Sequence, residues 1–455
     1  MKIIIVGLGS AGCALVKALS GENYDVTVID KNKSLVDNIT DNYNVNGIVG
    51  SGASKETLLK AGADTADALI ALTHIDEINL LSCMQAKSLG TRRTAVRLLL
   101  PDFVEEAERL KKDYNIDYFV KPKYDIAEEI NRNIGLPGFI KLEGFFGNAV
   151  QMLNLSLKEG SPLVGKNLME VKKQVNEDII VGTVIRDGKL YVPDGAFVLQ
   201  VDDQLGIVTD KETLADTLNK MGIEQKDSKK VSIVGGGITS EYLIKMLIEG
   251  KKDIAIYDNN IERCRELMAK HPQVKVNYAE GDVTEALEEE KVEKMDALVS
   301  ITDSDEVNLV ASMFAWSQNV PSIITRVDKA GHVKLLHKVN MDITVSPTEL
   351  SVLKMLRFIR NYEIGDAQND IVKFYTLAEG MAEALEFEAK AATKNLGVEF
   401  KDKAFKLKKN VIVAAIIRDD KLIIPCGSSA ILENDRVVIV SERKKHIKKL
   451  DDIFA

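Results

Sequence analysis

Two glycine-rich turns, far apart in the chain, carry the residue types from which phosphate-binding sites are built. The first is Gly7-Leu8-Gly9-Ser10-Ala11-Gly12, directly after an apolar run. The second is Gly235-Gly236-Gly237-Ile238-Thr239-Ser240, 228 positions later (235 − 7), also after an apolar run. Glycines allow the tight bend and close approach of backbone to a pyrophosphate, and the N–H groups that start the next helix face the phosphates. The spacing therefore predicts a nucleotide-binding turn in each half.

An acidic residue stands at the same distance beyond each turn. Asp30 lies 18 positions beyond Gly12, and Asp258 lies 18 positions beyond Ser240. A carboxylate at the end of the second strand accepts hydrogen bonds from adenosine ribose hydroxyls and repels a 2′-phosphate, which favours NAD(H) over NADP(H). Lys31, beside Asp30, softens this preference slightly.

The second turn departs from the pattern at its last position. Ser240 stands where the third glycine is expected, and because serine is small the fold should survive. Two interpretations stay open for this half: a second nucleotide site, or a structural copy with weakened or altered nucleotide preference. For the first half, the alternative to NAD-type binding is the same fold with an empty crevice.

Polar residues also follow the fourth and fifth predicted strands. Thr73 and His74, and Thr302 in the second half, are placed to touch ribose or the second half of a dinucleotide, because the carboxyl ends of parallel strands face the ligand crevice. Arg97 and Arg326 lie near the end of the fifth strand in each half. They are candidates for pairing with phosphate, with acids of a neighbouring subunit, or with a partner in a simple surface salt bridge.

The two halves match along most of their length. Asp67–Thr73 repeats as Asp296–Thr302, and Asp76-Glu77-x-Asn79 repeats as Asp305-Glu306-x-Asn308, both 229 positions later. We expect the acidic pair to cap the helix that follows. Such regular matches indicate a tandem duplication of one two-part unit.

Apolar runs alternate with helical patterns in the first part of each half, which predicts a doubly wound parallel sheet with helices on both faces. A small α+β module follows each sheet, and the polar stretch Glu224–Lys230 is the predicted linker. The fold class is thus α/β, with two Rossmann-like domains, each followed by a small α+β C-terminal module. The predicted boundaries are 1–140, 141–222, 229–365 and 366–455.

Composition limits the function classes. The net charge of −9 argues against a nucleic-acid partner, and no apolar stretch is long enough to cross a membrane. The chain enters its first strand at once, which leaves no room for a signal peptide. The four cysteines lack metal-ligand spacing, and none of the five histidines recurs at corresponding positions in both halves. We expect neither a metal site nor catalytic residues; the basic tail around 443–449 is expected to be a solvated helix.

The repeated motif resembles the signature of RCK (KTN) domains, which regulate potassium conductance. Its residues are Ala66–Thr73 followed by Asp76-Glu77-x-Asn79. Ser161-Pro162-Leu163-x-Gly165 and Val184–Gly188 with Pro193-x-Gly195 resemble the small module that follows an RCK domain. Two such units in one chain are similar to the peripheral subunits of bacterial potassium-uptake systems of the Trk type.

That resemblance implies a regulatory subunit with no enzyme activity. It implies NAD(H) in the crevices, with ATP or ADP at one of the two sites, and a membrane potassium-translocating partner of the Trk type. It also implies self-association into a ring, with a tetramer expected, in the cytoplasm at the inner face of the plasma membrane. The alternatives are an NAD-dependent oxidoreductase of unknown substrate and a soluble nucleotide sensor with another partner. The candidate cofactor-binding residues are Gly7, Leu8, Gly9, Ser10, Ala11, Gly12, Asp30, Lys31, Thr73, His74 and Arg97 in the first site, and Gly235, Gly236, Gly237, Ile238, Thr239, Asp258, Thr302 and Arg326 in the second.

Overall fold

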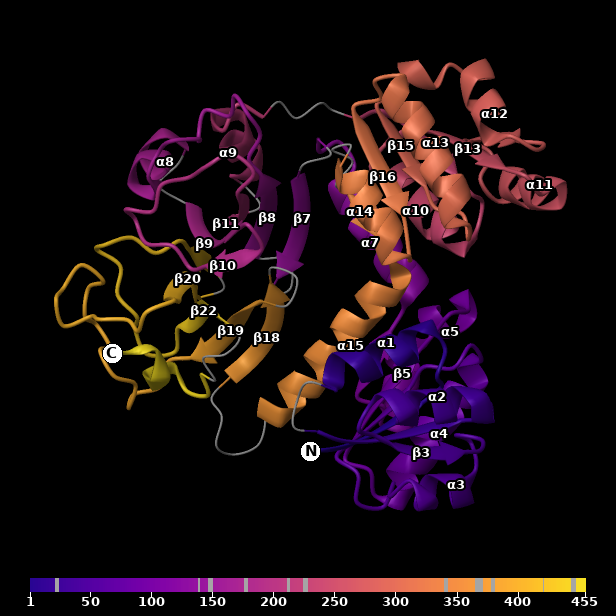
Figure 1. The fold of residues 1–455 in the computed structure, drawn as a ribbon, viewed down its shortest axis with the longest axis horizontal. Coiled ribbons are helices and arrows are strands. Elements are labelled where there is room, and N and C mark those ends of the chain that lie inside the picture. Colours follow the sequence, from indigo (N-terminus) through magenta and orange to yellow (C-terminus); the bar gives the residue numbers. More distant parts are fainter. Residues whose placement is uncertain are drawn as a thin grey trace.

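The computed structural model places four sheets in two α/β units and two smaller modules (Figure 1). Parts of the predicted linker (224–227) and of the basic tail (443–446) lie outside the residues that it describes. The described residues are 1–20, 24–137, 140–145, 150–175, 179–210, 213–223, 228–338, 343–364, 371–377, 381–419, 421–442 and 447–455.

The first α/β unit is a parallel six-stranded sheet in the order β3-β2-β1-β4-β5-β6. Successive residues of its central strand enter different cores: Ile3 and Ile5 pack on one side, Ile4 and Val6 on the other. Because side chains alternate along a strand, such a run must be covered on both faces. The elements are β1 (Lys2–Val6), α1 (Ser10–Leu19), β2 (Asp25–Asp30), α2 (Lys33–Asn42), β3 (Asn46–Val49), α3 (Lys55–Lys60), β4 (Ala68–Ala71), α4 (Asp76–Leu89), β5 (Arg93–Arg97), α5 (Pro101–Glu105), α6 (Ala107–Tyr114) and β6 (Tyr118–Val120).

The second α/β unit repeats this topology, with strand order β14-β13-β12-β15-β16-β17. Its elements are β12 (Lys230–Val234), α10 (Ile238–Glu249), β13 (Asp253–Asp258), α11 (Ile261–Lys270), β14 (Lys275–Tyr278), α12 (Val283–Glu289), the 3-10 turn η1 (Val292–Lys294), β15 (Ala297–Ser300), α13 (Asp305–Ser317), β16 (Ser322–Arg326), α14 (Ala330–Lys338) and β17 (Thr344–Val345).

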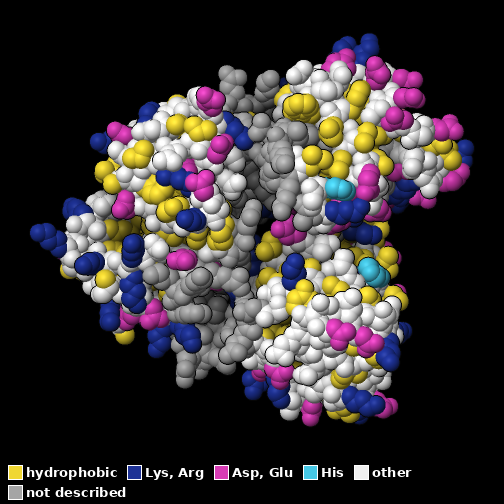
Figure 2. Space-filling view, in the orientation of Figure 1, with side chains coloured by type: hydrophobic (Ala, Val, Ile, Leu, Met, Phe, Trp, Pro, Cys, Tyr) yellow, Lys and Arg dark blue, Asp and Glu magenta, His cyan; other side chains and the backbone are white. Residues whose placement is uncertain are grey.

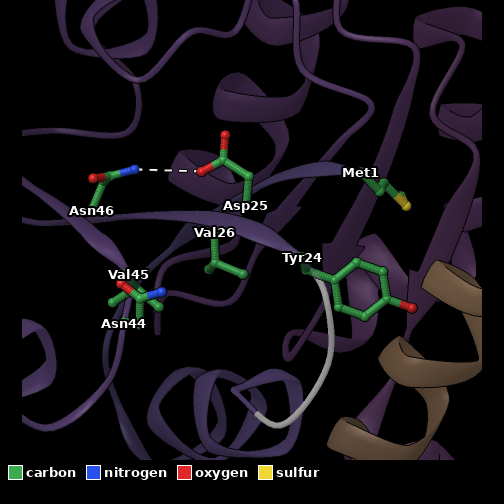
Figure 3. Close-up of a pocket in the computed structure, with 7 residues that line it drawn as sticks. All are labelled: Met1, Tyr24, Asp25, Val26, Asn44, Val45 and Asn46. Atoms are coloured by element: carbon green, nitrogen blue, oxygen red, sulfur yellow. Dashed lines mark hydrogen bonds between the residues drawn. The ribbon is translucent and has the colours of Figure 1, made fainter.

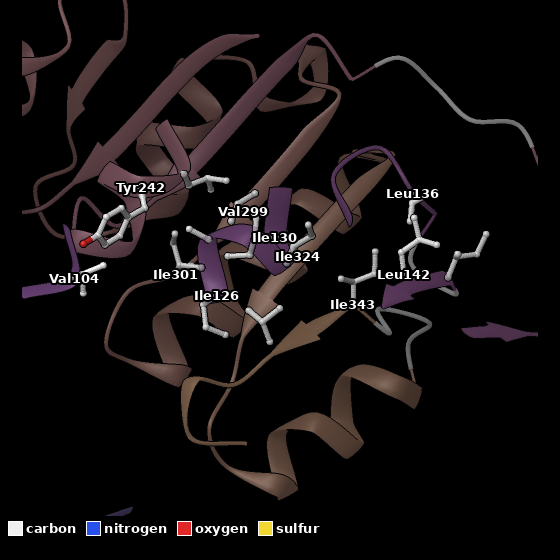
Figure 4. Packing of buried hydrophobic residues seen from close by; sticks show 14 of the residues in the cluster. Val104, Ile126, Ile130, Leu136, Leu142, Tyr242, Val299, Ile301, Ile324 and Ile343 are labelled. Atoms are coloured by element: carbon white, nitrogen blue, oxygen red, sulfur yellow. The ribbon is translucent and has the colours of Figure 1, made fainter. Parts of the chain in front are cut away.

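Two helices cross between the units. Helix α7 (Pro122–Asn133) follows β6 of the first sheet, yet its apolar residues Ile126 and Ile130 lie among Val299, Ile301 and Ile324 of the second sheet (Figure 4). Helix α15 (Pro347–Ile364) follows β17 of the second sheet and packs on the first unit. Each unit therefore completes its core with a helix from the other.

Further contacts fix the crossing helices. The ring of Phe358 on α15 stacks on Tyr118 of the first sheet with centroids 5.4 Å apart, while Met355 and Ile359 enter the first unit's core. Between the two crossing helices, Lys354 Nζ lies 2.7 Å from Asp125 Oδ1.

Each small module is a five-stranded antiparallel sheet, in the orders β10-β9-β11-β8-β7 and β18-β19-β22-β20-β21. In each, an arginine binds a buried aspartate with two parallel hydrogen bonds of 2.7 Å: Arg186 with Asp203, and Arg418 with Asp435. The first module contains β7 (Ile140–Phe145), β8 (Val150–Ser156), α8 (Leu168–Val175), β9 (Ile179–Arg186), β10 (Lys189–Tyr191), β11 (Gln204–Asp210) and α9 (Leu214–Lys220). The second contains β18 (Ile371–Leu377), β19 (Ala382–Glu388), β20 (Val411–Arg418), β21 (Lys421–Ile423), β22 (Arg436–Glu442) and the 3-10 turn η4 (Leu450–Ile453).

The predicted fold class is confirmed: two Rossmann-like parallel sheets, each followed by an antiparallel module, in tandem. In the described part of the chain, no helix combines the length and apolar character needed to cross a bilayer.

Candidate functional site

The first glycine turn is packed so closely that side chains are excluded from it. A Cβ atom on Gly12 would lie 1.9 Å from the carbonyl oxygen of Gly7, and one on Gly7, whose φ is +98°, would lie 2.8 Å from the backbone nitrogen of Thr73. A Cβ on Gly9 would lie 3.0 Å from His74 Nε2. The glycines thus bring α1 against the turn and the turn against the end of β4, at the edge of the sheet where the nucleotide crevice is predicted.

Asp30 holds this turn in place from the end of β2. Its Oδ2 accepts a 2.7 Å hydrogen bond from Leu8 N–H, and its Oδ1 accepts one of 2.8 Å from Asn32 N–H. Each carboxylate oxygen has two lone pairs, so acceptor capacity remains for ribose hydroxyls. No side chain caps α1, which begins at Ser10 after Gly9, so its first N–H groups are available to an anion.

The residues after β4 and β5 form one hydrogen-bonded assembly around Asn79. Its Oδ1 accepts from Thr73 N–H and Oγ1–H at 2.8 and 2.6 Å, and its Nδ2 donates to the carbonyl oxygens of Thr73 and Arg97 at 3.0 Å each. Asn79 was not among the predicted site residues. The sequence signal that could have identified it is its recurrence as Asn308 in the repeated motif.

Arg97 is buried, with 6% of its surface exposed. Its Nη2 donates to the carbonyl oxygen of Thr73 at 2.9 Å and lies 3.4 Å from His74 Nδ1. Burial lowers the pKa of the guanidinium, and the charge of Asp76 opposes that shift. The surface salt-bridge interpretation is therefore wrong for Arg97, because no ion pair joins it to another described residue.

The expectation that Asp76 caps its own helix is also wrong. Its Oδ2 accepts 2.8 Å hydrogen bonds from the N–H groups of Leu99 and Leu100 after β5, and no side chain caps α4. Its Oδ1 is buried without a hydrogen bond to any described residue. Burial raises the pKa of this carboxyl, and the two N–H groups oppose the shift.

The second crevice keeps the turn and the acid but changes their surroundings. Gly236 N–H donates to Asp258 Oδ2 at 2.6 Å, as Leu8 does to Asp30 in the first unit, and Gly237 precedes Ile238 and Thr239, the first residues of α10. Ser240 fits in place of a glycine, and its hydroxyl donates to the carbonyl oxygen of Gly235.

An arginine with no counterpart in the first crevice lies on this turn. Arg263 Nε donates to the carbonyl oxygen of Gly236 at 2.6 Å, and its guanidinium also pairs with Glu241 and Glu266. The residue 228 positions earlier is Leu35. The two turns therefore differ in the side chains that surround them.

The Asn308 assembly matches that of Asn79. Its Oδ1 accepts from Thr302 N–H at 2.8 Å, and its Nδ2 donates to the carbonyl oxygens of Thr302 and Arg326 at 3.0 and 3.1 Å. Unlike Arg97, Arg326 forms a salt bridge with Asp303, 2.7 Å away, whose side chain is 98% exposed. This ion pair agrees with the salt-bridge interpretation of Arg326, and its pairing with phosphate stays a prediction.

Two cavities lie elsewhere. One of about 380 Å³ lies beside Met1, Asp25 and Asn46, at the amino ends of β1, β2 and β3, opposite the glycine turn (Figure 3). The other, of about 500 Å³, is lined by residues of both small modules, including Pro193–Gly195 and Pro425–Gly427. The described residues contain no cluster of three or more His, Cys, Asp or Glu side chains that could hold a metal ion.

The sequences of both α/β units match a known protein family. The family model of the TrkA-N domain matches residues 3–121 and 231–347, which together make up more than half of the chain. The chain belongs to the TrkA-N domain family. The TrkA-C domain model matches residues 152–222, the first small module.

Similarity to individual proteins extends over the full length. The chain is 29% identical over 454 residues to the Trk system potassium uptake protein TrkA homolog of Archaeoglobus fulgidus, covering 100% of both chains. It is 27% identical over 461 residues to the Trk system potassium uptake protein TrkA of Vibrio alginolyticus, covering 100% of this chain and 98% of that protein.

Solved structures share the fold at low identity. The GsuK channel bound to NAD aligns with a TM-score of 0.63 at 17% identity, over 97% of this chain and 77% of that one. The GsuK RCK domain aligns with a TM-score of 0.64 at 16% identity, over 97% and 92%. These likenesses support the tandem arrangement of the fold.

Proposed function

We propose that this chain is a nucleotide-binding regulatory subunit of a potassium-uptake system. It binds NAD(H) in the two crevices, with ATP or ADP as the other candidate ligand at one of them, and acts without chemistry. The observation that carries the proposal is the full-length similarity to TrkA proteins, combined with a glycine turn held by an acid in both halves.

The predicted cofactor-binding residues lie at or just beyond the carboxyl ends of the strands in each unit, which supports a dinucleotide lying along that edge of the sheet. In the first unit the adenosine ribose would meet Asp30 and Lys31, the pyrophosphate would meet the start of α1 at Ser10 and Ala11, and the second nucleoside would reach Thr73. Arg97 stands at this far end, and the His74 ring lies between Arg97 and the glycine turn, 3.4 Å from Arg97 Nη2 and 3.0 Å from where a Cβ on Gly9 would lie.

Regulation follows from the crossing helices. Helix α7 leaves the carboxyl edge of the first sheet and enters the core of the second unit, so a movement at one crevice is carried to the other unit. A nucleotide shifts the assembly only as far as its affinities for two arrangements differ. A tenfold preference supplies about 1.4 kcal/mol per site.

Self-association into a ring, with four chains expected, is part of the proposal. Helix α13 exposes an apolar stripe at helical spacing, Val307, Val310, Met313 and Trp316, the last with 52% of its surface exposed. Figure 2 shows hydrophobic side chains on the face of the second α/β unit, where Figure 1 places α13. Trp316→Glu should lower the molecular mass in light scattering; an unchanged mass would exclude this face from the ring contact.

The decisive experiment measures potassium flux through a reconstituted Trk-type transporter, with and without this protein and with NADH, NAD⁺ or ATP. Flux should depend on the protein and on nucleotide, and the nucleotide response should weaken in Asp30→Ala and Asp258→Ala. Asp25→Ala, at the opposite end of the strand that carries Asp30, is the matched control. Flux indifferent to the protein would refute the transport role, and steady NADH consumption would favour an oxidoreductase.

A further inference from the structure

The imidazole ring of His74 lies over the first glycine turn. Its Nε2 is 3.0 Å from the position where a Cβ atom on Gly9 would be, and the two ring carbons beside it, Cε1 and Cδ2, are 3.7 and 3.9 Å from the same position. Because a hydrogen on Nε2 points outward between those two carbons, it points almost directly at this position. The missing side chain of Gly9 is what allows a pyrophosphate to approach the turn. An oxygen of that pyrophosphate would therefore lie at an ordinary hydrogen-bond distance from Nε2.

The other nitrogen of the ring faces a side chain that can only donate. His74 Nδ1 lies 3.4 Å from Nη2 of Arg97, and an arginine side chain has five N–H donors and no acceptor. Nδ1 must accept in this contact, so the hydrogen of the neutral ring is on Nε2. The same Nη2 donates to the carbonyl oxygen of Thr73, the residue before His74, at 2.9 Å. Arg97 thus fixes both the place and the tautomer of the ring.

The guanidinium behind the ring also makes it a better donor to an anion. Arg97 is 6% exposed, its Nε is buried without a hydrogen bond, and no ion pair joins it to another residue in the described ranges. A donor on Nδ1 draws electron density from the ring and so strengthens the hydrogen bond that Nε2 can donate. A diphosphate over the turn would bring negative charge to this side of the guanidinium.

The second crevice lacks this arrangement. Asp303 stands 229 positions after His74, at the corresponding place, and its carboxylate pairs with Arg326. Within the described part of the chain, no atom beyond the immediate neighbours of Gly237 and its own helix backbone lies within 4 Å of where a Cβ on that glycine would be. The second turn therefore has an acid in place of the donor, and that acid is turned away from the turn.

We propose that His74 is the side chain that binds the diphosphate of a nucleotide in the first crevice, with Arg97 as its positioning residue. This inference rests on the proposed nucleotide binding and assigns one contact within it. A phosphate oxygen accepts from Nε2–H as well as from the N–H groups at the start of α1. NADH and ADP both contain a diphosphate, so both depend on His74 at the first crevice and neither depends on it at the second.

The test measures NADH and ADP binding by isothermal titration to the full-length protein carrying Asp258→Ala, which leaves the first crevice alone. His74→Ala should weaken both ligands about tenfold, the order expected for one hydrogen bond to a charged group. His74→Gln should keep most of the affinity, because its amide reaches the place of Nε2. His74→Asn should lose as much as His74→Ala, because its amide reaches only the place of Nδ1. In the protein carrying Asp30→Ala, which leaves the second crevice alone, His74→Ala should change neither affinity and is the matched control.

A double-mutant cycle tests the positioning role of Arg97. Arg97→Met should weaken NADH binding in the protein with His74 and weaken it less in His74→Ala, because part of its effect passes through the ring. Equal losses in the two backgrounds would overturn the assignment of the tautomer to Arg97.

Two other results would overturn the role of His74. Tighter binding in His74→Ala would show that the ring obstructs the crevice, and a loss confined to NADH would place the ring at the second nucleoside. Unchanged affinities in His74→Ala would do the same, provided that Asp30→Ala removes one equivalent of NADH. If neither Asp30→Ala nor Asp258→Ala removes an equivalent, the crevices are not the nucleotide sites, and the proposed function falls as well.

Discussion

Asn79→Ala isolates the contribution of the assembly that joins the ends of β4 and β5. The substitution removes the bond from Thr73 N–H to Oδ1 and those from Nδ2 to the carbonyl oxygens of Thr73 and Arg97. The Thr73 hydroxyl keeps the carbonyl of Ile75 as an acceptor, so its bond is not counted. At about 1 kcal/mol for each buried hydrogen bond, the expected loss is about 3 kcal/mol.

Urea unfolding measures this loss, and NADH titration measures its effect on the first crevice. Because Thr73 and Arg97 would no longer be fixed, affinity at this crevice should fall while the second crevice keeps its own. Asn308→Ala, the matched variant, should reverse the pattern. A stability change below about 0.5 kcal/mol with unchanged NADH affinity would refute the structural role assigned to Asn79.

Two further pairs of variants compare the copies. Asp76→Asn should keep or raise the unfolding midpoint at pH 7, because the pKa of Asp76 is raised by burial and its charged form costs stability as the pH rises above 3.8. Asp305→Asn should lower that midpoint, because backbone N–H groups and His332 outweigh burial and lower the pKa of Asp305; this loss should vanish as the pH falls below 3.8. If Asp76→Asn and Asp305→Asn shifted the unfolding midpoint equally in thermal melts from pH 3 to 7, the opposite pKa directions given to the two carboxyls would be wrong. Gly12→Ala should cost NADH affinity at the first crevice, since its Cβ would lie 1.9 Å from a carbonyl oxygen and α1 would have to shift. Ser240→Ala should lose only the hydroxyl's bond, about 1 kcal/mol, with binding at the second crevice retained; a larger loss of NADH binding in Ser240→Ala than in Gly12→Ala would show that the contact distances do not govern the turns.

The glycine turns and their acids could be predicted from sequence because their geometry is local. Gly7, Gly12 and Asp30 act within one strand–turn–helix–strand segment, and the duplication presents the same spacing twice. The fold class followed for the same reason: alternating apolar runs and helical patterns require a sheet covered on both faces.

The exchange of helices could not be predicted in this way. Periodicity shows that Ile126 and Ile130 form a buried face, but it carries no information about which of two similar sheets covers that face. Hydrogen bonds between residues distant in sequence could not be predicted for a related reason. Asp76 looks like a helix cap, yet its Oδ2 accepts hydrogen bonds from the N–H groups of a loop that begins 23 residues away. The burial of Arg97 likewise depends on what packs around β5.

Because both units belong to one chain, corresponding positions of the two units can carry different residues, which is impossible in a pair of identical subunits. A symmetric pair must place the same residue at corresponding positions of both crossing helices, whereas here Lys123 stands on α7 and Thr348 at the corresponding position of α15. The turns differ likewise, with Arg263 on the second and Leu35 at the corresponding place in the first. If the crevices are unequal in this way, a change in nucleotide concentration fills them in sequence, and the proposed ring of such chains would pass through a half-filled state.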